Sequence, residues 1–209
     1  MSLFYRSFLV ASLLLFIPTG YSLAEWDCGN HIVSVASDAA PLFLSVAPDG
    51  SGDPFTSAAL FPYGARVDAT VTVQLLDCNY DAIAGYPAED LWLNTEDYAL
   101  VTCLQGSTAD GPTDSEGFTH WTQPLLGGGA SESGLKVYLN GDPLDVPPLP
   151  FLFNSPDLNG DRTVSLSDVS AFAADFHGDY DFRSDLNGDT QLSLGDVAKL
   201  AAALGANCP

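Results

Sequence analysis

The run Asp157-Leu-Asn-Gly-Asp161 sets how the C-terminal part of this chain folds, and it returns further along as Asp185-Leu-Asn-Gly-Asp189. Each run opens a twelve-residue loop with oxygen-bearing side chains at positions 1, 3, 5, 9 and 12. Ca²⁺ takes about six to eight oxygen ligands, and a loop with this spacing supplies them. We therefore expect two Ca²⁺ ions per chain, one in each loop.

The predicted metal ligands form two equivalent sets. Position 7 contributes a backbone carbonyl, and position 9 acts through a water molecule. The first set is Asp157, Asn159, Asp161, Thr163, Ser165 and Asp168, and the second is Asp185, Asn187, Asp189, Gln191, Ser193 and Asp196.

Apolar residues at helical spacing follow each loop and predict one short helix behind it. No helical pattern leads into either loop, because Pro156 stands just before the first. Each repeat is therefore a loop with an exiting helix. The apolar positions are Val169, Phe172, Ala173 and Phe176 in the first repeat, and Val197, Leu200, Ala201 and Leu204 in the second.

This arrangement resembles the dockerin family over about residues 155–207. The resemblance implies a small all-α module that binds two Ca²⁺ and docks onto a cohesin-type module of a scaffold or cell-surface protein. It also implies a link to polysaccharide-degrading bacterial assemblies. Position 6 of such a loop is usually Gly, but here it is Arg162 in one copy and Thr190 in the other. The residues at positions 10 and 11 also differ from the family's Ser–Thr type pair, so partner specificity does not carry over.

Composition and the N-terminus predict a secreted protein. The formal net charge of the 209-residue chain is −21, which excludes nucleic acid and anionic membrane surfaces as partners. Residues 1–24 have the pattern of a cleaved signal peptide: Arg6, an apolar run over residues 8–17, and Ser22-Leu-Ala24 before the cleavage point. That apolar run is too short to span a bilayer, so we expect no membrane span in the mature chain.

Four cysteines, an even number, suit disulfide bonding in a secreted chain. They are Cys28, Cys78, Cys103 and Cys208, and none has the spacing of a zinc or redox site. Of the three pairings that four cysteines allow, we favour Cys78–Cys103 with Cys28–Cys208.

The middle of the chain predicts β-strands. Residues 67–75 alternate between apolar and polar side chains, and turn clusters separate the other candidates. About seven short strands favour an antiparallel β-sandwich over residues 26–150. The other candidates are residues 31–36, 42–46, 90–93, 98–104, 118–123 and 135–139.

Two segments resemble bacterial immunoglobulin-like domains of the invasin and intimin type. They are residues 71–85, which hold a strand and a hairpin, and the turn at residues 113–119. The resemblance implies an immunoglobulin-like sandwich. Four prolines at residues 143–150 then predict a stiff connection to the C-terminal module.

No catalytic residue is predicted, and we expect a non-enzymatic protein that presents the sandwich on a docking module. Two alternatives remain open. Glu89, Asp90, Glu96 and Asp97 could serve a small glycoside hydrolase, although a solvated acidic loop is the simpler interpretation. Aromatic residues could form a carbohydrate-binding platform, but Trp92 and Trp121 alternate with apolar neighbours and are expected in the core.

Overall fold

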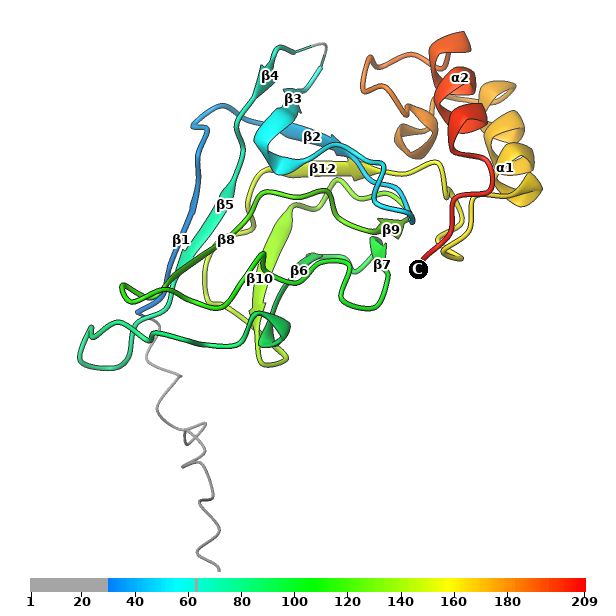
Figure 1. Cartoon of the computed structure of the whole chain (residues 1–209). Coiled ribbons are helices and arrows are strands. Elements are labelled where there is room, and N and C mark those ends of the chain that lie inside the picture. The colour runs from blue at the N-terminus through cyan, green and yellow to red at the C-terminus, as the bar shows by residue number, and fades with distance from the viewer. Residues whose placement is uncertain (1–29, 63) are drawn as a thin grey trace, which may run out of the picture.

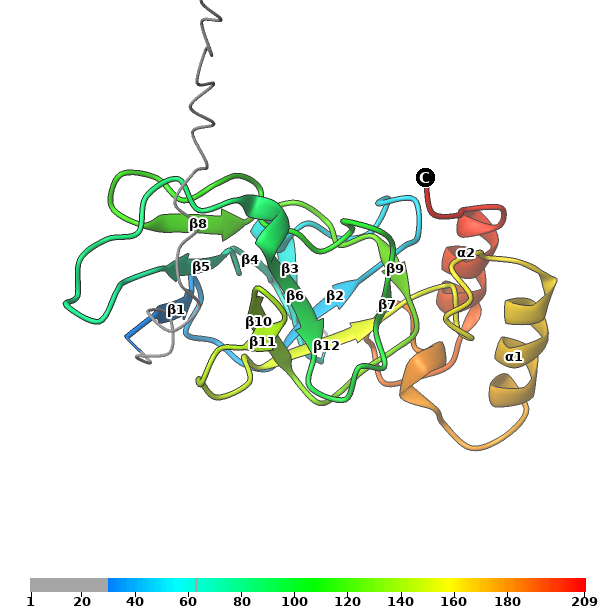
Figure 2. The same ribbon diagram turned by 90° about the horizontal axis from the view of Figure 1, so that it is seen from below.

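The computed structural model describes residues 30–62 and 64–209, and the chain is mainly β. The strands and their connections form one body, called here the β body, and the two α-helices lie side by side at one end of it (Figures 1 and 2). Residues 155–209, called here the C-terminal segment, carry both helices and both acidic loops. The predicted signal peptide, residues 1–24, lies outside the described residues.

Twelve strands, two α-helices and three short 3₁₀ helices make up the described chain. The helices are α1 (Leu166–Phe176) and α2 (Leu194–Ala203), and the 3₁₀ helices are Phe55–Ser57, Ala88–Asp90 and Phe182–Ser184. The strands are β1 (Ile32–Val35), β2 (Leu42–Ser45), β3 (Ala58–Leu60), β4 (Arg66–Val67), β5 (Val71–Gln74), β6 (Leu91–Thr95), β7 (Val101–Thr102), β8 (Phe118–Trp121), β9 (Gly127–Gly128), β10 (Leu135–Leu139), β11 (Asp142–Pro143) and β12 (Phe151–Asn154).

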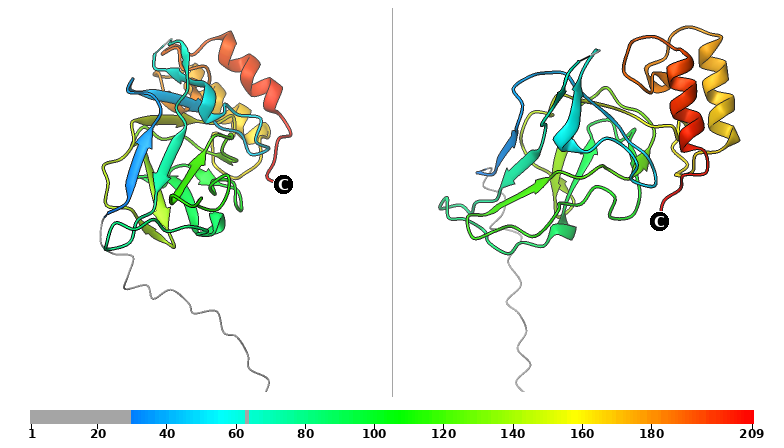
Figure 3. Two further views of the ribbon diagram at one scale, coloured as in Figure 1. Left: turned by 60° about the vertical axis from the view of Figure 1, so that its left-hand side comes forward. Right: turned by 45° about the horizontal axis from the view of Figure 1, so that its top comes forward.

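The strands form four small sheets, in the orders β1-β5-β8, β11-β10-β6, β12-β2-β3-β4 and β7-β9. The alternation of apolar and polar residues along β5 determines which of its side chains face the core. Val71 and Val73 are fully buried, while Thr72 and Gln74, which alternate with them, are half-buried. One apolar core fills the space between the sheets, and Trp121 lies in it as expected. The other turned views show the same arrangement of strands and helices (Figure 3).

The expected antiparallel immunoglobulin-like sandwich is wrong, although the mainly β content is confirmed. β12 pairs with β2 in parallel, with Phe151 opposite Leu42 and Phe153 opposite Leu44. The sequence around β12 suggested a linker because prolines precede it. The rings of Phe151 and Phe153 are fully buried, however, and burial of such large apolar side chains draws this segment into the core.

The expected separate all-α module at the C-terminus is also wrong. The C-terminal segment holds two helices, a 3₁₀ helix and a β-bridge between Thr163 and Asn207. Its own buried cluster is small and consists of Leu158, Val164, Phe172, Leu186 and Leu200. The segment therefore depends on the β body: the Phe182 ring packs edge-on against Phe43 of β2, at 6.2 Å between centroids.

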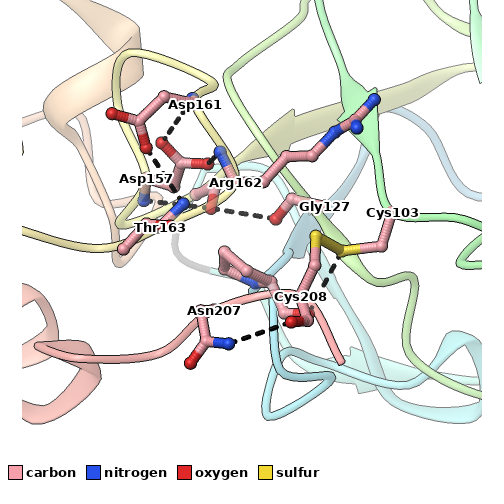
Figure 4. Close-up of a disulfide and its surroundings, with 10 residues drawn as sticks. Cys103, Gly127, Asp157, Asp161, Arg162, Thr163, Asn207 and Cys208 are labelled. Atoms are coloured by element: carbon pink, nitrogen blue, oxygen red, sulfur yellow. Dashed lines mark hydrogen bonds between the residues drawn. A yellow bond between two sulfur atoms is a disulfide. The ribbon is translucent and has the colours of Figure 1, made fainter.

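A disulfide joins the two parts and corrects the predicted cysteine pairing. Cys103, which follows β7, bonds Cys208 near the C-terminus (Figure 4). The predicted pairs Cys78–Cys103 and Cys28–Cys208 are therefore both wrong. Cys78 is also disulfide-bonded. Cys28 lies outside the described residues. Spacing along the chain could not reveal this pairing, because it depends on how the tail returns to the β body.

Among the helices that the structure describes, none has both the length and the apolar character needed to cross a membrane.

Candidate metal centre

Each acidic loop ends in a helix that its own residues cap. Ser165 stands before α1, and its hydroxyl accepts a hydrogen bond from the Ser167 N–H while Asp168 accepts one from the Ser165 N–H. Ser193 and Asp196 form the same capping box before α2. Such reciprocal caps satisfy backbone donors that a helix start leaves unpaired. Positions 9 and 12 of the loops are thus fixed by the helices that follow.

In the first loop, backbone N–H groups hold the acidic side chains in place. Asp157 accepts from the Asp161 N–H at 3.1 Å and from the Arg162 N–H at 2.7 Å. Asn159 Oδ1 accepts from the Asp161 N–H at 2.8 Å, and Asp161 Oδ1 accepts from the Thr163 N–H at 3.0 Å. The backbone of the loop therefore turns around the side-chain oxygens of Asp157, Asn159 and Asp161.

The second loop repeats this network residue by residue. Asp185 accepts from the Asp189 N–H at 3.0 Å and from the Thr190 N–H at 2.7 Å. Asn187 Oδ1 accepts from the Asp189 N–H at 2.9 Å, and Asp189 Oδ1 accepts from the Gln191 N–H at 2.9 Å. The two loops therefore share the same hydrogen-bond pattern between backbone and side chains.

Position 6 adopts the left-handed conformation in both loops despite lacking glycine. Its φ is +71° at Arg162 and +60° at Thr190, and the glycine at position 4 is also left-handed in each copy. A side chain in this region costs roughly 1 kcal/mol. The short hydrogen bonds from the Arg162 and Thr190 N–H groups to the position 1 carboxylates offset that cost. The departure from glycine therefore leaves the sharp turn intact.

Positions 1 and 12 place two buried carboxylates close together in each loop. Asp157, Asp168, Asp185 and Asp196 are all fully buried. Burial raises the pKa of Asp157, N–H donation from Arg162 opposes the shift, and the charge of Asp168 adds to it. Burial likewise raises the pKa of Asp196, and the charge of Asp185 adds to that shift. Buried like charges are unfavourable unless a cation or hydrogen bonds compensate them.

The remaining predicted ligands lie at the open side of each loop. In the first loop these are Asn159, Asp161 and Thr163, which are exposed, and Ser165, which is half-buried. In the second loop Asn187, Asp189 and Ser193 are half-buried, and Gln191 is exposed.

The chemical types of the oxygen donors in each loop suit Ca²⁺. Each loop offers carboxylate, amide, hydroxyl and backbone carbonyl oxygens, which a hard cation takes. Within the described residues, however, no three His, Cys, Asp or Glu side chains are grouped as a metal site would require. Each loop thus brings two carboxylates together in its buried part, and the Asp161 and Asp189 side chains accept local backbone N–H bonds instead.

The first loop is seated on β9 of the β body. The Gly129 N–H donates to the Asp157 carbonyl at 2.7 Å, and the Ser155 hydroxyl donates to the Gly127 carbonyl at 3.3 Å. A Cβ at Gly128 would collide with the Asp157 carboxylate, so only glycine leaves room for it. Figure 4 shows Gly127 beside this loop and the disulfide below it.

The second loop is seated on β2 and β12. Asn154, which is fully buried on β12, donates from its side-chain amide to the Asp185 carbonyl. Gly188 lies against the Phe43 ring, where a Cβ would come within 3.0 Å. The Tyr180 hydroxyl donates to Asp185 Oδ2 at 2.8 Å. Both position 1 carboxylates thus rest on residues outside their own loops.

A partly exposed ion pair connects α1 to the chain before the second loop. Arg183 donates two hydrogen bonds of 2.8 Å to Asp175 of α1, and the Ser184 hydroxyl donates a third at 2.6 Å. These bonds, led by the one from Arg183, lower the pKa of Asp175 against the opposing effect of burial. The first helix and the second loop are therefore held together.

Sequence reasoning missed Gly128, Asn154 and Tyr180. Glycines and asparagines are frequent in turns, so nothing in the sequence separated Gly128 and Asn154 from their neighbours. Tyr180 precedes the second loop by five positions and matched no ligand position.

The acidic residues considered for a glycoside hydrolase, and Trp92, lie in and around β6. Glu89 and Asp90 lie in the 3₁₀ helix before β6, and Glu96 and Asp97 lie in the turn after it. The expectation that Trp92 packs in the core is wrong. It lies on the outer face of β6, half-buried, because Leu91 and Leu93 on either side of it point inward.

Comparisons with known proteins identify no relative: no family model, no curated protein and no solved structure matches this chain.

Proposed function

We propose that this is a secreted, non-enzymatic protein whose two loops each bind one Ca²⁺ and whose helical end docks onto another protein. One observation carries the calcium proposal. Loops 157–168 and 185–196 reproduce the same hydrogen bonds, the same left-handed residues and the same pair of buried carboxylates. The capping boxes account for the position 12 carboxylates. A bound cation would offset the cost of burying a second carboxylate, at position 1, beside each of them.

The buried and the exposed residues of each loop have different roles in binding the ion. Asp157 and Asp168 in the first loop, and Asp185 and Asp196 in the second, supply buried negative charge from two sides. The exposed or half-buried residues at positions 3, 5, 7 and 9 close the site from the solvent side. When bound, Ca²⁺ supplies the positive charge that offsets the repulsion between the buried carboxylates.

The docking proposal rests on the two helices. Leu166 and Leu194 occupy the same position in the two repeats and are 77% and 79% exposed. Large apolar side chains this exposed, at matching places on neighbouring helices, are typical of an interaction surface. With the resemblance of the repeats to dockerins, this favours a cohesin-type partner. The Cys103–Cys208 disulfide favours an oxidising compartment outside the cytoplasm.

Calcium titration by calorimetry tests the first part of the proposal. We expect two bound Ca²⁺ for the unaltered protein and one for Asp168→Asn or Asp196→Asn, because each substitution removes one buried charge without changing side-chain shape. Asp142→Asn, at an exposed position of β11, is the matched control and should keep both ions. No bound calcium in the unaltered protein would sink the proposal.

Surface plasmon resonance with a panel of recombinant cohesin-type modules tests docking. We expect binding in Ca²⁺ that disappears in EGTA, and at least about tenfold weaker binding for the Leu166→Asp/Leu194→Asp variant because its apolar contacts are lost. That variant should still bind two Ca²⁺. If no module binds, or if the double variant binds as tightly as the unaltered protein, the helical end does not dock in this way.

A further inference from the structure

An aromatic row lies on the outer face of the β11-β10-β6 sheet, on the side away from the core. Trp92 of β6 and Tyr138 of β10 are register partners, and their rings stack almost parallel at 5.9 Å between centroids. Tyr98, from the turn after β6, folds back so that its ring lies 6.1 Å from that of Tyr138. Tyr138 is buried, with 5% of its surface exposed, whereas Tyr98 is 60% exposed.

The packing fixes these rings before any ligand arrives. Trp92 and Tyr138 are on adjacent hydrogen-bonded strands, and the buried Tyr138 ring is in contact with both the Trp92 and the Tyr98 rings. Burial and a hydrogen bond with Tyr98 raise the pKa of Tyr138 to about 12. Rigid aromatic side chains give contact area at a low cost in conformational entropy.

Polar groups border the row on the same face. Asn94 of β6 lies opposite Lys136 of β10, next to the Trp92–Tyr138 pair in the register. Lys136 is 3.9 Å from Glu96, so an ammonium group and a carboxylate lie together beside the rings. A half-aromatic face that also offers amide, ammonium and carboxylate groups is suited to an uncharged partner rich in hydroxyl groups.

We propose that this face, formed by Trp92 and Tyr98 over the buried Tyr138 ring, with Asn94, Glu96 and Lys136 beside them, binds a neutral polysaccharide. The C–H groups on one side of a pyranose ring carry partial positive charge and stack on the electron-rich face of an aromatic ring. The hydroxyl groups at the ring edge then meet amide, carboxylate and ammonium groups with donors and acceptors to match. An anionic glycan would be repelled by the chain's overall charge. The proposal uses none of the acidic loops.

Affinity electrophoresis of the full mature chain tests this proposal. Native gels are cast with hydroxyethylcellulose, arabinoxylan or galactomannan, and migration is compared with that in a gel without polysaccharide. We expect at least one of the three to retard the protein, in Ca²⁺ and in EGTA alike if the chain stays folded. Tyr98→Ala should weaken that retardation by about tenfold, the loss expected for one stacked ring.

Tyr80→Ala is the matched control. Tyr80 is 70% exposed and, like Tyr98, has a positive φ, but it lies in a turn away from this sheet. It should leave the retardation unchanged, and both variants should unfold at a temperature near that of the unaltered protein. The proposal is overturned if none of the polysaccharides retards the protein, or if the two tyrosine variants behave alike. It is also overturned if a proline-rich peptide, and none of the polysaccharides, quenches the tryptophan fluorescence of the unaltered protein and quenches that of Tyr98→Ala less.

Discussion

Gly128→Ala is expected to remove calcium from the first loop and to lower the free energy of unfolding by about 1–3 kcal/mol, the range found for overpacked sites. The new methyl group would occupy the place of the Asp157 carboxylate, which has no other room because it is fully buried. Moving that carboxylate breaks its bonds to the N–H groups of Asp161 and Arg162. Calorimetry should then count one Ca²⁺ instead of two, with the second loop unaffected.

Gly111→Ala serves as the control for this substitution, because a Cβ there meets nothing within 4 Å. It should bind two ions and unfold as the unaltered protein does. Denaturant unfolding in EGTA separates the packing effect from the metal effect, since the collision exists without calcium. A Gly128→Ala protein with full stability and two bound ions would show that the first loop does not sit on β9 as described.

Loss of the disulfide should have the largest effect on stability. We expect Cys103→Ser/Cys208→Ser to lower the free energy of unfolding by about 4 kcal/mol, because a link between residues 105 apart restricts the unfolded chain strongly. The tail after α2 should also loosen, since it is otherwise held to the first loop by few bonds. One of these is from the Cys208 N–H to the Arg162 carbonyl, at 3.2 Å.

Denaturant unfolding and hydrogen exchange measure these two effects. Leu104→Ser/Asn207→Ser is the matched control, because it alters the neighbours of both cysteines and leaves the bond intact. Leu104 is 92% exposed, so this control should change stability little. If the disulfide variant unfolds at the same denaturant concentration as the control, the link does not stabilise the native chain.

The acidic loops show what the sequence could predict. Spacing of oxygen-bearing residues predicted two equivalent loops, and apolar periodicity predicted a helix behind each one. These features are local, since residues within about twelve positions determine them. Alternation likewise located β5, whose residues facing the core are every second one along the strand, and turn clusters on either side located β10.

Features that depend on distant contacts could not be predicted in this way. β12 followed a proline cluster, and its pairing with β2 and its bridge to Ser131, both distant in sequence, made it a strand. The Cys103–Cys208 pair required the tail to return to the β body. Trp92 alternated with leucines, which fixed that it and they lay on opposite sides of β6. Which of the two sides faced the core was decided by the packing of the whole sheet.

The link between Cys103 and Cys208 also determines how mechanical tension would pass through this protein. If a partner holds α1 and α2 while the β body is attached to a polymer, a pulling force acts between the two ends. The force then has a covalent route from the tail after α2 to the end of β7, in addition to the backbone through β12. Hydrogen bonds between the loops and the β body are relieved of part of the load, and the anchored protein can be pulled without its C-terminal segment peeling away.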